Sequence, residues 1–179
     1  LDGDHYVVNG TKNFITNGGF ASTFVVFVRG DDADKHAGIS AFIVEKGTPG
    51  FSIGKKEDKL GIRASATSEI VFEDCRIPVE NRLGEEGEGF KIAMSALDNG
   101  RYTVAAGATG LIRACLEESV SYAQQRETFD VPISQHQLIQ QKVAYMSLWY
   151  ETARLLYLKA GWLKNQGQRN TRETSQAKW

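Results

Sequence analysis

Two charged side chains of opposite sign lie three residues apart in a stretch with helical periodicity. Asp98 and Arg101 fall on neighbouring positions of one face if residues 90–125 form a helix. An arginine within an apolar helix face is costly unless a carboxylate pairs with it. The spacing therefore predicts an Asp98–Arg101 ion pair, which either supports helix packing or lines a ligand cavity between helices.

A second candidate site combines an aromatic ring and a hydroxyl group in the segment Lys12 to Gly19. Alternate residues of a strand point to the same face, so Phe14 and Thr16 could present a flat ring and a hydrogen-bond donor to a planar heterocycle. The alternative is a core phenylalanine and a threonine that ends a strand before an Asn17-Gly18 turn.

A third candidate site lies where one predicted helix ends and the next begins. The first helix gives way to a loop at Arg126 to Asp130, and His136-Gln137 lie in the first turn of the second, where Ser134 and Gln137 have capping-box spacing. An arginine, a hydroxyl and a helix N-terminus can hold a phosphate or diphosphate. The alternative is ordinary capping beside a solvated arginine. His136 has no carboxylate or nucleophile partner in the sequence, so we do not predict it to be a general base.

Composition and motifs exclude several other classes. The chain has 179 residues, 41% hydrophobic content and a net charge of −1, which suits one large or two small domains and no nucleic-acid surface. No apolar run is long enough to span a membrane, and no signal peptide begins the chain. It contains no nucleophile elbow, P-loop, dinucleotide fingerprint or metal-ligand spacing, and Cys75 and Cys115 are expected to be free thiols.

Because the chain starts within a strand-and-turn pattern and stops within a helical one, we expect it to be the middle of a longer protein.

Residues 1–82 read as antiparallel β structure, in a small barrel or sandwich. Asn9-Gly10 predicts a two-residue hairpin turn between two strands, and polar loops are expected over residues 30–37 and 55–66. The apolar runs and the turn residues between them predict strands at residues 5–8, 11–16, 23–28, 39–45, 51–53 and 68–72.

From Phe90 the hydrophobic period becomes helical. The first helix is expected to pack through a seam of apolar residues at alternating steps of four and three, and a close backbone neighbour is expected at Gly107 and Gly110. This seam comprises Phe90, Met94, Leu97, Val104, Ala108, Leu111 and Cys115, with Arg101 in the remaining position. A second helix from Ser134 to about Gly167 is expected to lie antiparallel to it, and a third to begin after Asn170.

The ordered set of motifs resembles the acyl-CoA dehydrogenase family of flavoenzymes, most closely its short-chain, butyryl-type branch. The matching segments are KNFITNGG at 12–19, GISAFIVEKGTPGFSIGKKEDKLGIRASAT at 38–67, FEDCRIPVENRLGEEGEGFKIAMSALDNGR at 72–101, RETFD at 126–130 and HQ at 136–137. The resemblance implies an α+β fold, with an antiparallel β-barrel middle domain at 1–82. Part of a C-terminal domain follows at 83–179, built from long antiparallel helices of an incomplete four-helix bundle.

The resemblance also implies an activity, which is the α,β-dehydrogenation of a short-chain acyl-CoA with FAD as hydride acceptor. It implies a homotetramer whose FAD sites are shared between subunits, and an electron-transfer flavoprotein as partner. No nucleic acid, metal or membrane insertion is expected. The location implied is the cytoplasm of a bacterium or the mitochondrial matrix of a eukaryote. An acyl-CoA oxidase and a non-catalytic interaction module are the alternatives.

Site residues carry over from the family motifs by position. Phe14, Ile15 and Thr16 match the segment along the flavin ring, and Asp98, Asn99, Gly100 and Arg101 match the acyl-CoA segment. Arg126, Glu127, Thr128, His136 and Gln137 match the segments that bind the FAD diphosphate of an adjacent subunit. Some branches carry the catalytic glutamate at the position of Gly100, so here the base is expected downstream of the chain, and the chain alone is expected to be inactive.

Two further departures from the family pattern concern FAD. Phe14 stands where tryptophan is frequent, and Asp130 stands where glycine is usual. Aspartate tolerates a positive φ better than most residues, but its charge is unfavourable near a diphosphate.

Overall fold

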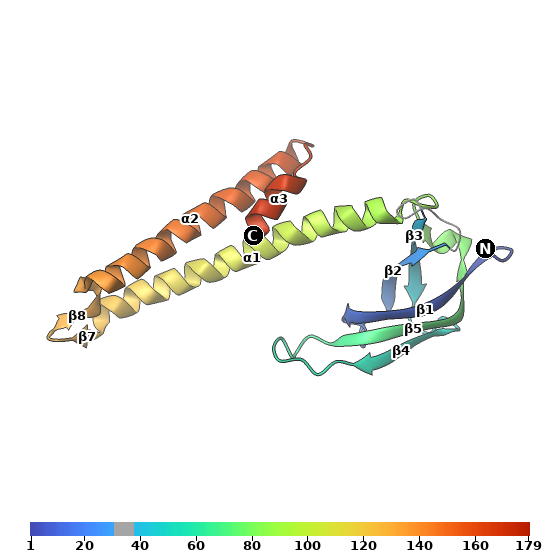
Figure 1. Ribbon diagram of the computed structural model, residues 1–179, viewed down its shortest axis with the longest axis horizontal. Coiled ribbons are helices and arrows are strands. Elements are labelled where there is room, and N and C mark those ends of the chain that lie inside the picture. The colour runs from blue at the N-terminus through green and yellow to red at the C-terminus, as the bar shows by residue number, and fades with distance from the viewer. Residues whose placement is uncertain (31–37) are drawn as a thin grey trace. The chain divides into compact units, whose positions relative to one another are not determined.

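The computed structural model describes residues 1–30 and 38–179, which form two compact units, Leu1–Ala93 and Met94–Trp179 (Figure 1). The first unit is built mainly from antiparallel strands and the second from helices, so the predicted α+β class is confirmed. Most of the polar loop predicted at residues 30–37 lies outside the described residues.

The strands of the first unit form two antiparallel sheets. One contains β1 (His5–Thr16), β5 (Thr67–Pro78) and β4 (Phe51–Lys56), in the order β1-β5-β4. The other contains β2 (Thr23–Arg29), β3 (Ile39–Glu45) and the short β6 (Arg82–Leu83), in the order β2-β3-β6. A 3₁₀ turn, Val79–Asn81, precedes β6. The sequence pattern did not predict β6, because two residues are too few to show a period.

Both sheets contribute to one apolar core. Strands alternate buried and exposed side chains, as in β2, where Phe24 and Val26 are buried and Val25 is exposed. Phe51 joins the sheets, since its ring centroid lies 4.9 Å from that of Phe24 and 5.1 Å from that of Phe72. The core comprises Val8, Phe24, Val26, Phe42, Val44, Phe51, Ile70, Phe72, Cys75 and Ile77.

The hairpin predicted at Asn9-Gly10 is wrong. β1 passes through these residues as one strand and pairs with β5 on both sides of an irregularity between Val8 and Gly10. The Asn9 side chain donates to the Asp74 carboxylate at 3.0 Å and accepts the Asp74 backbone N–H at 2.6 Å. A long neighbouring strand pairs with both halves of β1, so the Asn-Gly dipeptide forms a bulge instead of a turn.

The helices are α1 (Gly89–Gln125), α2 (Gln137–Asn165) and α3 (Thr171–Lys178), and the short strands β7 (Glu127–Thr128) and β8 (Val131–Pro132) lie between α1 and α2. α1 and α2 lie antiparallel, as predicted (Figure 1). The Tyr102 and Tyr157 rings meet edge to face at 6.2 Å, and Lys164 donates a hydrogen bond to the Asn99 side chain. α3 begins after Asn170, also as predicted.

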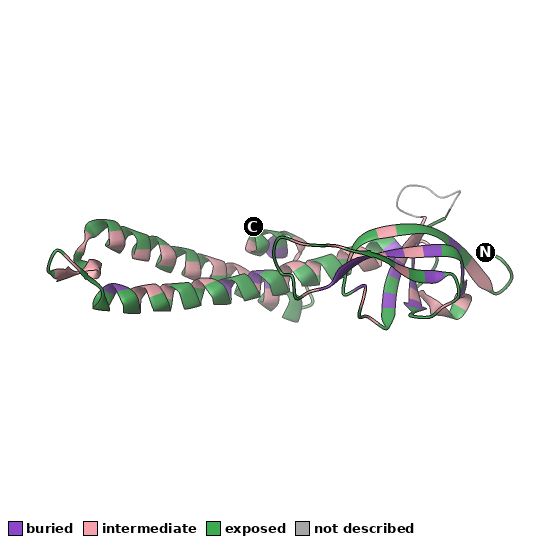
Figure 2. Cartoon of the chain, turned by 90° about the horizontal axis from the view of Figure 1, so that it is seen from below, coloured by how far each residue is buried: buried purple, intermediate pink, exposed green. Residues whose placement is uncertain are grey.

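The expected packing face of α1 is wrong by one position. Leu97, Val104 and Leu111 of the predicted seam are 49%, 58% and 68% exposed. Much of α1 is exposed along its length (Figure 2). Beyond its first residue, Gly89, α1 buries Ala105, Thr109 and Ala123, which lie on an adjacent face. Within the described chain nothing comes within 4 Å of a Cβ built on Gly107 or Gly110, so the close approach expected there is not made. α1 is apolar on more than one face, and periodicity does not say which face α2 covers.

The predicted face of α2 is correct. Its seam residues are buried or half-buried, and they are Ile139, Val143, Met146, Tyr150, Ala153, Tyr157 and Ala160. The predicted helix start is wrong, because Ser134 belongs to a 3₁₀ turn, Ile133–Gln135, and α2 has His136 as N-cap with no side-chain cap hydrogen bond. Pro132, directly before that turn, has an extended backbone conformation. The first residue of α2 is therefore Gln137.

Candidate functional site

The segment Phe14–Thr16 ends strand β1 with an irregular backbone. The β1–β5 register shifts between Lys12 and Ile15, and Phe14 adopts a φ of 59°. A bulky residue in the left-handed region is strained, and such residues are frequent at ligand sites. Ile15 packs against the core, whereas Phe14 is 72% exposed and Thr16 is also exposed. The alternative of a core phenylalanine is therefore wrong.

The surroundings of Phe14 are held firmly. Ile15 and Thr16 pair with Ser68 and Thr67 of β5, and the Asn17 N–H donates to the Ala66 carbonyl at 2.7 Å. Lys12, two residues before Phe14, is half-buried, and the loss of hydration on burial lowers the pKa of its ammonium group. An exposed ring and an exposed hydroxyl thus lie on a rigid strand end, which suits contact with a flat ligand.

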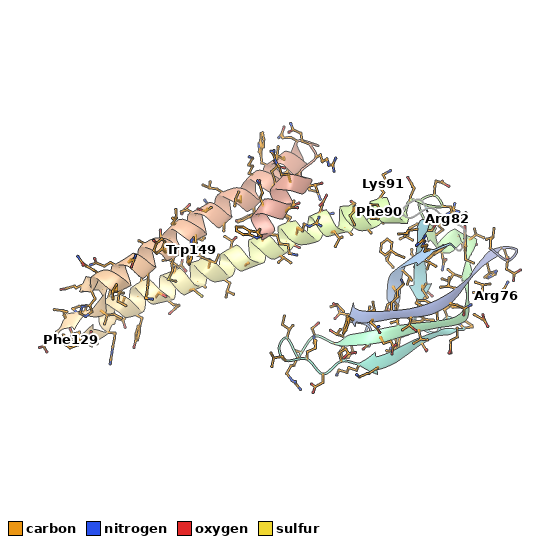
Figure 3. All side chains as sticks on the ribbon, viewed as in Figure 1. Arg76, Arg82, Phe90, Lys91, Phe129 and Trp149 are labelled. Atoms are coloured by element: carbon orange, nitrogen blue, oxygen red, sulfur yellow. The ribbon has the colours of Figure 1, made fainter. Side chains whose placement is uncertain are left out.

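The segment after α1 forms a tight hairpin instead of an open loop. β7 and β8 pair antiparallel around Phe129 and Asp130, whose φ values are 54° and 61°. Two central residues with positive φ are typical of a type I′ turn. Asp130 thus adopts the positive φ anticipated for its position. Phe129 is 91% exposed at the hairpin tip (Figure 3).

The hairpin brings the two predicted diphosphate-binding segments together. The Thr128 hydroxyl and His136 Nε2 share a hydrogen bond of 2.9 Å, and the Ile133 N–H donates to the Arg126 carbonyl at 2.8 Å. His136 also meets the Phe129 ring edge to face, with centroids 6.2 Å apart. Arg126, Glu127 and Gln137 are exposed around this contact. A guanidinium, a hydroxyl, an imidazole and a helix N-terminus, which are groups that can bind anions, thus occur within this one segment.

The predicted Asp98–Arg101 ion pair is present on α1. Arg101 Nη1 donates to Asp98 Oδ1 at 2.7 Å, and the side chains of Arg101 and Asp98 are 30% and 23% exposed. The second carboxylate oxygen, Oδ2, accepts the Thr171 hydroxyl at 2.7 Å. Asn99 and Gly100 are exposed, and a Cβ built on Gly100 would meet no described atom within 4 Å.

Sequence reasoning missed the contribution of α2 and α3 to this site. Lys164 of α2 bonds to Asn99, and Thr171 of α3 bonds to Asp98. Both partners are far from Asp98 in sequence, so only the antiparallel return of the chain brings them near. Asn170-Thr171 did signal a helix start, but a helix start does not say which neighbour its hydroxyl meets.

Within the helical unit, the Asp98–Arg101 pair and the β7–β8 hairpin do not form one site. Asp98–Arg101 and the β7–β8 hairpin lie toward opposite ends of α1, and the 24-residue separation of Arg101 from Gln125 spans about 36 Å of helix. In the part of the chain that the structure describes, no cluster of three or more potential metal ligands occurs, and no helix is long and apolar enough to cross a membrane.

Family models assign almost the whole chain. Residues 1–75 match the acyl-CoA dehydrogenase middle domain, and residues 87–179 match the acyl-CoA dehydrogenase C-terminal domain. The chain belongs to the acyl-CoA dehydrogenase family. This membership confirms the resemblance drawn from the motifs, which fall in both matched regions.

Several similar proteins are about half identical to the chain. The mitochondrial short-chain specific acyl-CoA dehydrogenase of Rattus norvegicus is 51% identical over 177 residues, which are 99% of this chain and 43% of that protein. The butyryl-CoA dehydrogenase structure from Megasphaera elsdenii superimposes with a TM-score of 0.92 at 48% identity, over 99% of this chain and 46% of that one. A chain in the electron transferring flavoprotein study of Acidaminococcus fermentans matches with a TM-score of 0.91 at 50% identity, over 99% and 47%. The chain thus spans less than half of the length of these relatives.

Proposed function

We propose that the chain forms the middle and first C-terminal parts of a FAD-dependent acyl-CoA dehydrogenase. The enzyme would convert a short-chain acyl-CoA thioester into the α,β-unsaturated enoyl-CoA. Residues 1–82 would serve as its β-domain and residues 83–179 as part of its helical domain. Support comes from two relatives named for short-chain or butyryl substrates, each about half identical to this chain.

The observation that carries this proposal is the half-buried Asp98–Arg101 pair. Asp98 hydrogen-bonds to the Arg101 guanidinium at Nη1, and the Arg101 side chain remains 30% exposed. A guanidinium presents five N–H groups in a fixed plane, so those turned away from Asp98 can donate to carbonyl or phosphate oxygens of an acyl-CoA. Asn99 and Gly100 would add an amide and an unobstructed backbone to the same contact.

The residues of the β unit suit a flavin ring. Phe14 offers an exposed aromatic face, and Thr16 offers an exposed hydroxyl on the same rigid strand end. We assign Phe14 and Ile15 to packing along the ring and Thr16 to a hydrogen bond at its polar edge. FAD, when bound, would supply the hydride acceptor of the reaction, and the strand end would orient it.

The donor set at the hairpin suits the FAD diphosphate. Arg126 contributes positive charge, and Thr128, His136 and Gln137 contribute a hydroxyl, an imidazole and a helix N-terminus, with Glu127 in the same segment. The family resemblance assigns this group to the FAD of an adjacent subunit, and about 36 Å of helix separates it from Arg101. On the same resemblance we propose a homotetramer with FAD sites shared between subunits.

The catalytic base, electron acceptor and location complete the proposal. Gly100 carries no side chain beside Arg101, so the base would come from outside these residues. An electron-transfer flavoprotein would receive the electrons, and a chain from a study of such a protein is among the similar structures. The location would be the bacterial cytoplasm or the mitochondrial matrix.

Turnover by the complete enzyme tests the proposal. Butyryl-CoA added without oxygen should bleach the flavin absorbance of the purified, FAD-loaded protein. Arg101→Lys keeps the charge but loses the planar fork, so KM for butyryl-CoA should rise at least about tenfold. Arg113→Lys is the matched control, because Arg113 lies on the same helix and pairs with Glu117 at the surface. No bleaching by wild-type protein would contradict the activity, and an unchanged KM in Arg101→Lys would contradict the substrate site.

A further inference from the structure

The Asp98 carboxylate is held from two sides by residues of different helices. Oδ1 accepts a hydrogen bond from Arg101 Nη1 in the next turn of α1, and Oδ2 accepts one from the hydroxyl of Thr171, the first residue of α3. Both donor–acceptor distances are 2.7 Å. A carboxylate with both oxygens bonded does not rotate freely about its Cβ–Cγ bond, so its plane is defined by the two donors.

The hydroxyl that holds Asp98 lies on a firmly anchored helix start. Asn170 donates its side-chain amide to the Ala160 carbonyl of α2 at 2.9 Å. Thr174 is buried, and its backbone N–H donates to the Asn170 carbonyl at 2.9 Å. α2 and α3 thus fix the backbone of Thr171, which transmits their position to the α1 carboxylate.

Arg101 depends on Asp98 for its orientation. Among the described residues, the Arg101 guanidinium hydrogen-bonds only to Asp98, through Nη1. A side chain tethered at one point takes its direction from that point. Any rotation of the Asp98 carboxylate would therefore turn the face of the guanidinium that a ligand meets.

We propose that Thr171 is a positioning residue for acyl-CoA binding. Its hydroxyl orients Asp98, and Asp98 orients Arg101 toward the thioester substrate. The inference rests on the proposed function, since it takes the acyl-CoA to bind at Arg101. It adds α3 to the substrate site, although α3 itself need not touch the substrate.

The test uses Thr171→Val in the complete, FAD-loaded enzyme. Valine has nearly the shape of threonine but donates no hydrogen bond. KM for butyryl-CoA should rise about tenfold, with kcat changed less than about twofold, because the lost charge-assisted hydrogen bond orients Asp98, and through it Arg101, for substrate binding. Thr171→Ser keeps the hydroxyl and should return KM to within about twofold of wild type. Thr152→Val is the control, since the Thr152 hydroxyl bonds only within its own helix, to the Leu148 carbonyl.

Two further measurements separate positioning from packing and from the parent proposal. Binding of the thioether S-butyl-CoA, measured by calorimetry, should weaken in Thr171→Val by the same factor as KM. In an Arg101→Lys background, Thr171→Val should have little added effect, because both changes act through the same guanidinium. Loss of thermal stability with unchanged KM and unchanged thioether affinity would overturn the positioning role. If Arg101→Lys also left both values unchanged, the substrate site itself would be misassigned.

Discussion

The β unit and the helical unit bury their side chains in different ways. In the β unit, ten apolar residues from five strands close on one another as a core. In the helical unit, the buried residues are small or polar, and they are Ala105, Thr109, Ala123, Ala160, Glu173 and Thr174. Large apolar side chains there remain exposed, among them Leu111, Trp149 and Trp162.

The difference follows from how each element satisfies its backbone. A strand needs a neighbouring strand for its hydrogen bonds, so β structure brings side chains into contact as it forms. A helix satisfies its backbone internally and forms with its apolar faces uncovered. The β unit is therefore complete in its core, and the outer faces of α1 and α2 are suited to further contacts.

The largest effect expected from this comparison is the loss of a core side chain. Ile70 is 2% exposed, and Ile70→Ala should lower the free energy of unfolding of the β unit by about 2–5 kcal/mol. Val25→Ala on the exposed face of β2 should change it by less than about 0.5 kcal/mol. Urea unfolding measured by circular dichroism would report the change. All the tryptophans lie in the helical unit, so their fluorescence reports the unfolding of that unit. If Ile70→Ala shifted the fluorescence transition as much as the β-unit transition, the two units would not unfold independently.

The two cysteines allow a second comparison, since each unit contains one. Cys75 lies fully buried in the β core, and burial raises the pKa of its thiol, whereas Cys115 is exposed on α1. At pH 8 a thiol reagent should label Cys115 at least about a hundredfold faster than Cys75. The variants Cys75→Ser and Cys115→Ser each keep one of the two thiols, so they assign each labelling rate to its cysteine. Comparable rates would show that the β core opens readily.

Two glycines compare a covered helix face with an uncovered one. A Cβ on Gly161 would lie 2.9 Å from the Tyr102 hydroxyl, whereas one on Gly110 would meet nothing within 4 Å in the described chain. Gly110→Ala should therefore stabilise the helical unit by about 0.5–1 kcal/mol, and Gly161→Ala should destabilise it by about 1 kcal/mol. Thermal unfolding of both variants measures this. Destabilisation by Gly110→Ala would mean that another segment or a second copy packs closely on α1.

The smallest expected effect concerns the start of α1. The Glu88 carboxylate accepts the Glu85 N–H at 3.1 Å and the Lys91 ammonium at 3.2 Å, and these contacts lower the pKa of Glu88. A lowered pKa stabilises the fold above the unfolded value of about 4.3, and that stabilisation is lost as pH falls through the folded value. At pH 7 the Tm of the wild type should thus be slightly higher than the Tm of Glu88→Gln. Melting curves that differ equally at pH 7 and below pH 4 would contradict this.

The sequence predicted the features that depend on local spacing. Asp98 and Arg101 pair because three residues of helix bring their side chains together, whatever surrounds them. The seam of α2 and the start of α3 were predicted for the same reason. Asn9-Gly10 misled because the dipeptide suits both a turn and a bulge, and the presence of β5 alongside decides between them.

What the sequence by itself determined is the family, the α+β class, the Asp98–Arg101 pair and the residue types that suit a flavin ring and a diphosphate. Only the tertiary structure decided which face of α1 meets α2, how the β7–β8 hairpin joins Thr128 to His136, and that Thr171 holds Asp98. Motifs and helical spacing are properties of short segments. Contacts between distant segments depend on how whole elements pack, and many sequences with the same periods allow more than one packing.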